Sequence, residues 1–259
     1  MTFSIGLLIA LLAVDGEDAP LPARIQFDEP FLTVVDPQIE APRLGFALGA
    51  QARVAFPFGS ADRGTVIASG NTIAILNRID YSELLNPGLG FTLEADVMSK
   101  PPPPPPGGPP WERTPAMGGY VAFEWDWFGG SRMTDDVGSS IRPETLKLPS
   151  VLVGFKASGT VEGNFFGDLR FGLGAAHFPS LEATFQQQGG PEFRGELFAD
   201  TWAFAMELRL HFGWHLGPMA FVFGLGGRLM SPPRAGRNVN FDTGALFTFD
   251  LELGTEIGF

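Results

Sequence analysis

The last sixteen residues of the chain, GALFTFDLELGTEIGF (residues 244–259), alternate between apolar and polar side chains. Counting back from the end, the odd positions are apolar with one threonine, and the even positions from 258 back to 248 are glycine, threonine or acidic. Successive side chains of an extended strand point to opposite faces, so one face of this segment is apolar and the other carries three carboxylates. Because a chain terminus frays unless it is held, we expect this strand to be paired within a sheet.

The same alternation recurs along most of the chain. Seven further strands are predicted at residues 43–58, 89–98, 120–127, 150–158, 167–175, 201–214 and 219–229. The links between them alternate in length, with short links at 159–164 and 215–218 and mostly long ones elsewhere. Residues 65–76 could add two strands, for ten in all, and residues 180–198 could extend two strands outward as a hairpin.

Composition excludes several classes of function. Hydrophobic residues make up 44% of the 259 residues and charged residues only 18%, against about 25% in a typical soluble domain. The formal net charge of −12 disfavours a nucleic-acid partner, which needs a basic footprint. With no cysteine there is no disulfide, thiol nucleophile or zinc–thiolate site. We expect no cofactor and no metal.

Two segments differ from this strand pattern. Residues 5–14 form an apolar run too short to cross a bilayer as a helix, and the start of the chain resembles a secretory signal. We therefore expect a signal peptide at 1–19, a periplasmic or plug segment at 20–42 and a barrel at 43–259. No Lys or Arg precedes the run, so the alternative is a packed or disordered N-terminal segment. The run PPPPPPGGPP (101–110) is interpreted as a polyproline II spacer, with a ligand for a polyproline-recognition module as the alternative.

Alternation alone fits both a membrane barrel and a soluble, lipocalin-like barrel with an apolar interior. The polar faces are rich in Gly and Ala, as the narrow interior of an eight-stranded barrel requires. The apolar faces carry no charge, and aromatic residues fall near strand ends, as in membrane barrels. The membrane interpretation places a charge network in the lumen, with carboxylates in excess: Arg53, Glu94, Asp96, Glu124, Asp126, Lys156, Asp168, Arg170, Glu207, Arg209, His211, Arg228, Asp250, Glu252 and Glu256.

The C-terminal pattern resembles the assembly signal of bacterial outer-membrane β-barrels, whose last strand ends in an aromatic residue. It consists of Leu251, Leu253, Thr255, Ile257 and Phe259. Thr255 departs from the usual apolar residue. The resemblance covers about residues 43–259. It implies an all-β, closed, antiparallel, up-and-down transmembrane barrel of eight strands, or ten, in the bacterial outer membrane. Its partners would be the lipid bilayer and, during insertion, the barrel-assembly machinery.

The sharpest enzyme candidate is HFPSLE (177–182), in which His177, Ser180 and Glu182 supply the side-chain types of a triad. A lipid A deacylase of this architecture would place His and Ser two residues apart on one strand face. Here they are three apart across Pro179 and point to opposite faces if extended. We therefore interpret them as loop residues, with an enzyme acting on lipid A as the alternative.

Other polar patterns are also better explained by structure. Glu207, Arg209 and His211 lie on one face and could relay protons, but a hydrogen-bond network explains them equally well. His211 and His215 do not converge on a strand as they would on a helix. Four acidic residues on adjoining strands, Glu94, Asp96, Glu124 and Asp126, could hold a divalent cation, but pairing with Arg is the commoner arrangement.

We therefore expect a protein that is not an enzyme, with a structural, surface-interaction or narrow-conduit role. The alternatives are an outer-membrane lipid-modifying enzyme and a secreted ligand carrier. The ligand or partner of the loops, the state of the lumen and the oligomeric state are left open by the sequence.

Overall fold

The computed structural model of the chain describes residues 43–62, 64–68, 71–76, 78–100, 116–134, 138–162 and 164–258. These residues belong to one compact unit, residues 40–259. The expected signal peptide (1–19), the segment 20–42, the polyproline run (101–110) and Phe259 lie outside the described residues.

Eight long strands close into an antiparallel barrel in the order β1-β17-β15-β14-β11-β10-β7-β6. Their bounds are β1 (Arg43–Phe58), β6 (Gly88–Lys100), β7 (Ala116–Phe128), β10 (Leu146–Glu162), β11 (Phe165–Phe178), β14 (Thr201–Leu216), β15 (Met219–Met230) and β17 (Leu246–Gly258). The predicted up-and-down barrel is confirmed with eight strands. The count of ten is wrong, because residues 65–76 belong to β3 (Gly64–Ala68) and β4 (Asn71–Leu76), which pair outside the barrel.

The first and last strands seal the barrel. β17 pairs with β15 on one side and with β1 on the other, in a register that sets Arg53 opposite Glu252 and Ala47 opposite Gly258. In the described part of the chain, each of the eight barrel strands pairs with a neighbour on both sides, so the backbone hydrogen bonds of the barrel wall are made within the wall itself. This pairing is the reason why the terminal alternation is so regular.

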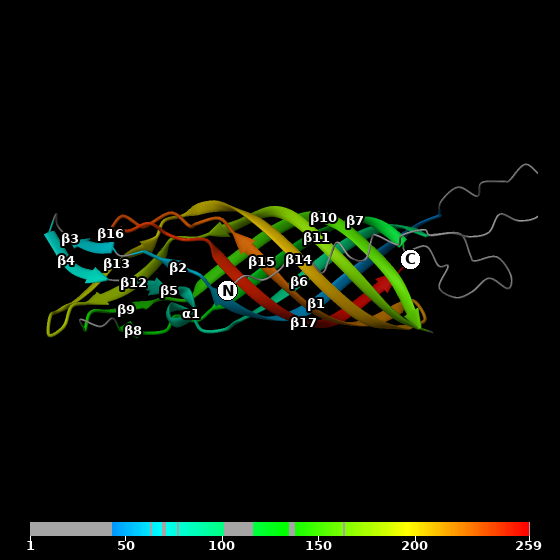
Figure 1. Cartoon of the computed structure of the whole chain (residues 1–259), viewed down its shortest axis with the longest axis horizontal. Coiled ribbons are helices and arrows are strands. Elements are labelled where there is room, and N and C mark those ends of the chain that lie inside the picture. Colours follow the sequence, from blue (N-terminus) through cyan, green and yellow to red (C-terminus); the bar gives the residue numbers. More distant parts are fainter. Residues whose placement is uncertain are drawn as a thin grey trace, which may run out of the picture. The chain divides into compact units, whose positions relative to one another are not determined.

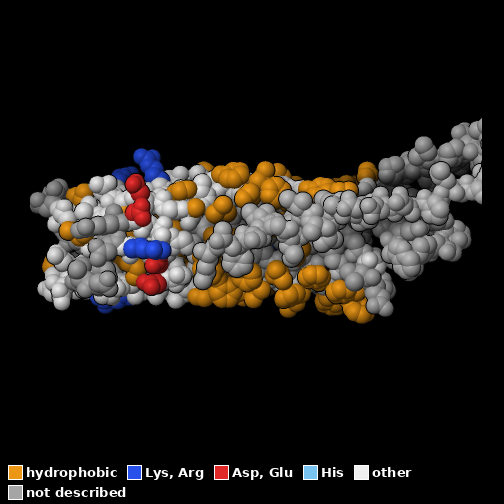
Figure 2. Space-filling view, in the orientation of Figure 1, with side chains coloured by type: hydrophobic (Ala, Val, Ile, Leu, Met, Phe, Trp, Pro, Cys, Tyr) orange, Lys and Arg blue, Asp and Glu red, His pale blue; other side chains and the backbone are white. Residues whose placement is uncertain are grey.

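The pleat turns apolar side chains outward and charged ones inward. Phe204 and Leu253 are 57% and 66% exposed, whereas Glu207 and Glu252 are 1% and 2% exposed. Figure 2 shows the apolar side chains gathered over the barrel strands. A soluble carrier needs the opposite arrangement, so that alternative is wrong. The even strand count, apolar belt, short turns at one end and long links at the other are the features of bacterial outer-membrane barrels, which confirms that prediction.

Aromatic side chains line both ends of the apolar belt. Towards the long links, Trp125 and Trp127 stack with ring centroids 5.9 Å apart. At the opposite end, Phe165 packs against Trp214 at 6.0 Å. This is the girdle arrangement that amphipathic rings adopt at the two membrane interfaces.

The long links between barrel strands fold into small sheets beyond one end of the barrel, here called the loop end (Figure 1). One sheet has the order β13-β12-β9-β8 and a second has the order β16-β3-β4. The predicted hairpin at 180–198 is β12 with β13, turned at Gly189, whose φ of +70° favours glycine. The bounds of the link elements are β2 (Ser60–Ala61), β5 (Ile79–Asp80), α1 (Tyr81–Leu84), β8 (Met133–Thr134), β9 (Ser140–Pro143), β12 (Leu181–Gln186), β13 (Glu192–Phe198) and β16 (Val239–Asn240).

Short links join β10 to β11 and β14 to β15 at the opposite end, here called the turn end. Within the described part of the chain, no helix has the length and hydrophobicity that a helical membrane span requires.

Candidate functional site

The polar face of the barrel wall forms a lumen filled with charged side chains. Each of the fifteen lumen residues named from the sequence is at most 8% exposed in the structure. Figure 2 accordingly shows charged side chains only beyond the apolar belt on the face that it views. A buried charge is costly unless it is paired, so the contacts inside the lumen decide whether the arrangement is stable.

Small residues in the wall make the space for these side chains. A Cβ built on Gly172 would lie 2.4 Å from the Tyr120 hydroxyl and 2.9 Å from Glu207 Oε1. A Cβ on Gly224 would lie 2.5 Å from the His211 ring. These two glycines are therefore required by the close approach of neighbouring side chains, as the narrow interior of an eight-stranded barrel predicts.

Three arginines bind two carboxylates of β7 in the half of the lumen towards the loop end. Arg53 donates from Nη2 to both oxygens of Asp126 at 2.7 Å, and its Nη1 lies 2.9 Å from Glu124 Oε2. Arg228 contacts both carboxylates as well, and Arg209 contacts Glu124. We call Arg53, Glu124, Asp126, Arg209 and Arg228 the loop-side cluster. Multidentate contacts of this kind hold planar groups in a fixed geometry.

Glu252 links this cluster to the histidine of the lumen. Arg209 Nη1 lies 3.1 Å from Glu252 Oε1, and His211 Nε2 lies 2.7 Å from Glu252 Oε2. Arg209 also pairs with Glu207, which accepts a 2.6 Å hydrogen bond from the Tyr120 hydroxyl. The row Glu207, Arg209, His211 is thus part of a network, which joins Glu207 to Arg209 along β14 and reaches across the lumen to Tyr120 on β7 and Glu252 on β17.

A second group of charges fills the lumen towards the turn end. Lys156 Nζ lies 2.5 Å from Asp96 Oδ2, 3.2 Å from Glu256 Oε2 and 3.3 Å from Asp168 Oδ2. Arg170 contacts Glu256 and lies 3.1 Å from Asp168 Oδ2. With Glu94, which also contacts Arg170, these residues form the turn-side cluster, defined as Glu94, Asp96, Lys156, Asp168, Arg170 and Glu256.

The four acidic residues of β6 and β7 divide between the two clusters. Glu124 and Asp126 lie with arginines in the loop-side cluster, whereas Glu94 and Asp96 lie in the turn-side cluster. They do not form one four-carboxylate cation site.

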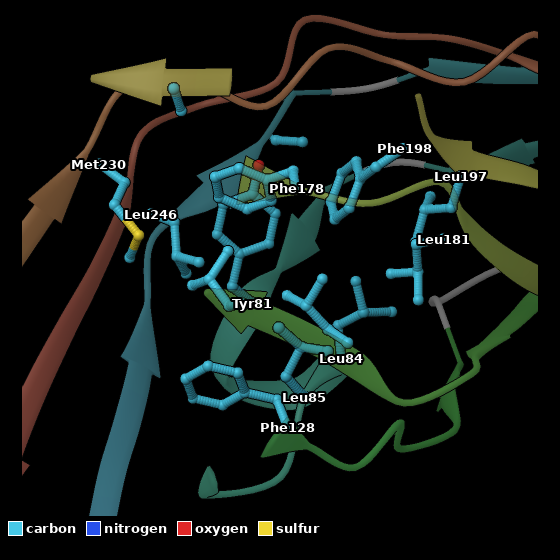
Figure 3. Packing of buried hydrophobic residues seen from close by; sticks show 14 of the residues in the cluster. Tyr81, Leu84, Leu85, Phe128, Phe178, Leu181, Leu197, Phe198, Met230 and Leu246 are labelled. Carbon is cyan, nitrogen blue, oxygen red and sulfur yellow. The ribbon is translucent and has the colours of Figure 1, made fainter. Parts of the chain in front are cut away.

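A cluster of buried apolar residues lies at the loop end of the barrel, and Figure 3 shows how its members pack together. The Tyr81 ring packs edge-on against Phe198 at 6.1 Å, and Phe178 packs against Phe198 at 6.4 Å. The Tyr81 hydroxyl donates to the Gly244 carbonyl at 3.1 Å, and burial raises the pKa of this phenol. We call this cluster the loop cap; its members labelled in Figure 3 are Tyr81, Leu84, Leu85, Phe128, Phe178, Leu181, Leu197, Phe198, Met230 and Leu246, each at most 2% exposed.

The candidate triad residues have separate partners. His177 Nε2 lies 3.2 Å from Asp200 Oδ1, and its ring lies 4.9 Å from that of Trp202. Ser180 donates to Glu196 at 2.7 Å. Glu182 pairs with Arg194 at 2.5 Å.

No contact between any two of these three candidates is found among the described residues. The hydroxyl of Ser180 therefore faces an acid and not a base.

The outer surface of the link sheets carries a polar cavity of about 400 Å³. Its lining includes Ser180, Glu182, Arg194, Glu196, Arg237 and Asn238. The Ser180 hydroxyl and the Arg237 backbone N–H both donate to Glu196, and these hydrogen bonds lower the pKa of that carboxyl. The cavity offers both hydrogen-bond donors and acceptors to a polar ligand.

The proposed assembly pattern lies on the outer face of β17. Leu251, Leu253, Thr255 and Ile257 stand opposite residues of β1 and carry no charge. Leu253 is the most exposed, at 66%. Phe259 lies outside the described residues, and recognition of this pattern by the assembly machinery remains a prediction.

Two features of the lumen and its loop end were not predicted from the sequence. The loop cap joins two links, residues 59–87 and 179–200, with the ends of β7, β11, β15 and β17, and no spacing along the chain marks these segments as partners. The cross-strand contact of Asp168 with His211 depends on the register between β11 and β14. No spacing along the chain signals that register.

The comparisons place several outer-membrane proteins among similar structures. A structure of Ail, the attachment invasion locus protein of Yersinia pestis, in complex with the heparin analogue sucrose octasulfate is 13% identical, covers 83% of this chain and 99% of its own, and has a TM-score of 0.35. Neisserial surface protein A (NspA) is 10% identical to this chain, and the match covers 82% of this chain and 96% of NspA with a TM-score of 0.38. The outer membrane protease OmpT from Escherichia coli is 9% identical to this chain, and the match covers 83% of this chain and 96% of OmpT with a TM-score of 0.40.

No protein-family model matches the chain, and no curated protein matches it.

Proposed function

We propose that this chain is a non-conducting outer-membrane anchor that holds a folded surface of outer loops for contact with a partner. The observation that carries this proposal is the double closure of the lumen. Paired charges fill its interior, and the loop cap covers its loop end. Ions crossing such a lumen would have to separate buried ion pairs and pass a dry apolar layer, which costs far more than crossing a hydrated pore.

The loops support the second half of the proposal. Their strands pair across different links, as in β9 with β12 and β3 with β16, so the loops hold one another. Two carboxylates from separate segments, Glu144 and Glu182, meet the single guanidinium of Arg194. A surface that is ordered before binding loses less conformational entropy when a partner docks.

Planar-bilayer recording of the purified full-length chain tests the closed lumen. We expect no single-channel conductance above the leak of the bilayer. Steady, voltage-independent openings would contradict the anchor and favour the narrow conduit. Phe198→Ser with Leu246→Ser, which opens the loop cap, leaves the ion network in place, so we expect this variant to stay closed as well.

Mass spectrometry of lipid A tests the enzymatic alternative. Cells expressing the chain or its His177→Ala variant should carry identical lipid A, because His177 and Ser180 contact different partners. Loss of an acyl chain with the natural sequence, restored by the variant, would replace the anchor with a surface enzyme.

A further inference from the structure

We propose that the lumen holds one divalent transition-metal ion, bound by Asp168, His211 and Glu256 near the turn end. One ring nitrogen of His211 and one carboxylate oxygen from each acid lie within 4.8 Å of one another. Ligand atoms bound to one zinc ion at roughly 2.1 Å lie closer together than this, so binding requires shifts of about 1 Å.

One ring nitrogen of His211 is free to act as a metal ligand. Its Nε2 lies 2.7 Å from Glu252 Oε2, so this nitrogen carries the proton that the carboxylate accepts. Its Nδ1 is buried and has no hydrogen-bond partner, and in this tautomer it presents a lone pair. Histidines that bind a metal usually donate the N–H of their other ring nitrogen to a carboxylate or carbonyl, which fixes the tautomer and orientation of the ring. A Cβ at position 224 would lie 2.5 Å from the His211 ring, so glycine at this position leaves room for the imidazole.

The two acids also have coordination capacity to spare. Asp168 is 3% exposed, and its Oδ1 has no partner because Lys156 and Arg170 both contact Oδ2. Glu256 receives both cations, but each carboxylate oxygen has a second lone pair. Oxygen and imidazole donors together suit Zn²⁺ or Mn²⁺ better than Ca²⁺ or Mg²⁺, which prefer oxygen alone.

Charge balance points to a divalent ion. The turn-side cluster holds four carboxylates and two cationic side chains, an excess of two negative charges when all are ionised. An uncompensated charge on buried side chains is unfavourable, and a bound divalent ion removes this excess.

A cavity of about 350 Å³ gives the ion a route. It lies at the turn end and is lined by Asp96, Lys156, Asp168, His215 and Glu256 among others. Two of the three proposed ligands, Asp168 and Glu256, therefore line this cavity, and His211 stands opposite Asp168 on the neighbouring strand. An entry path and a hydrogen-bonded second layer are what a functional metal site requires.

The experiment is a Zn²⁺ titration of the tag-free, chelator-treated, full-length barrel in detergent, followed by calorimetry and by metal analysis after gel filtration. We expect one Zn²⁺ per chain. His211→Gln and Asp168→Asn should each weaken binding at least tenfold, while the matched control His177→Gln at the loop end should bind as the natural sequence does. Absence of stoichiometric Zn²⁺ from the natural sequence, or equal binding by a folded His211→Gln barrel, would overturn the proposal.

Histidine ¹⁵N NMR gives an answer that does not depend on damaging the site. The chain has three histidines, and their signals can be assigned with His177→Gln and His215→Gln, which leave the three ligands in place. Zn²⁺ should shift the resonances of His211 alone. A shift confined to His215, at the cavity mouth, would mean adventitious binding and would refute the site.

Discussion

Replacing Arg53 with methionine removes one cation from the loop-side cluster and keeps most of the apolar stem. The Arg53 side chain has no exposed surface, contacts both oxygens of Asp126 at 2.7 Å, and lies 2.9 Å from Glu124 Oε2. In the variant, Arg209 and Arg228 alone would neutralise these two acids together with neighbouring carboxylates. The lumen would then hold an additional uncompensated buried charge.

Breaking a buried ion pair from one side typically costs about 3–5 kcal/mol, because the remaining charge stays desolvated. We expect Arg53→Met to lower the free energy of unfolding by about that amount. The matched control is Arg78→Met. Arg78 pairs with Asp80 at 2.8 Å with its side chain 70% exposed, and loss of such a surface pair changes stability by about 0–1 kcal/mol.

Urea unfolding in lipid vesicles measures the loss of unfolding free energy in each variant. The transition is followed by tryptophan fluorescence and by the mobility shift of unheated samples on gels. The double variant Arg53→Met with Asp126→Asn should recover part of the loss, since the acid left unpaired is then neutral. Equal and small effects of Arg53→Met and Arg78→Met would refute the view that the lumen is a dry, paired network.

Three further predictions test the wall, the lipid face and the loops. Gly224→Ala should destabilise the barrel by about 1–3 kcal/mol, because its Cβ would overlap a buried imidazole; Gly159→Ala, with nothing within 4 Å of its Cβ, should be nearly neutral in the same urea unfolding experiment. Leu208→Arg, on the outer face of β14 and 52% exposed, should cost about 2–4 kcal/mol in a bilayer; vesicle unfolding at unchanged stability would be inconsistent with lipid contact. Ionised Glu196 stabilises its loop contacts above its ordinary pKa near 4.5, and this stabilisation is lost as pH falls through the lowered folded value. Ser180→Ala should raise that pKa, and a carboxyl NMR titration that is identical in both proteins would contradict this assignment.

The strands of the barrel could be predicted from sequence because each has a simple period of two and a length set by the membrane. In 201–214, seven large apolar side chains share one face with no charge among them, and that pattern has few solutions other than a lipid-facing strand. The same pattern placed fifteen ionisable residues on the opposite, polar faces of the strands, and each is at most 8% exposed.

Pairing within the lumen could not be predicted, because it depends on register and on contacts across the barrel. Arg53 on β1 meets Asp126 on β7, although these strands are not neighbours in the wall. The loop cap could not be predicted from the sequence for a related reason. Tyr81 and Phe198 are separated by more than one hundred residues, and nothing in either link marks the other as its partner.

Quenching of tryptophan fluorescence by lipids brominated at the acyl-chain centre tests the orientation of the pleat most directly. Two variants are compared in a background whose natural tryptophans are phenylalanine: Leu208→Trp on the outer face and Tyr120→Trp in the lumen, where Tyr120 is 3% exposed. Strong quenching at position 208 and none at position 120 is the predicted result. Strong quenching at 120 with none at 208 would contradict a barrel whose apolar side chains face the bilayer and whose charges are sealed inside.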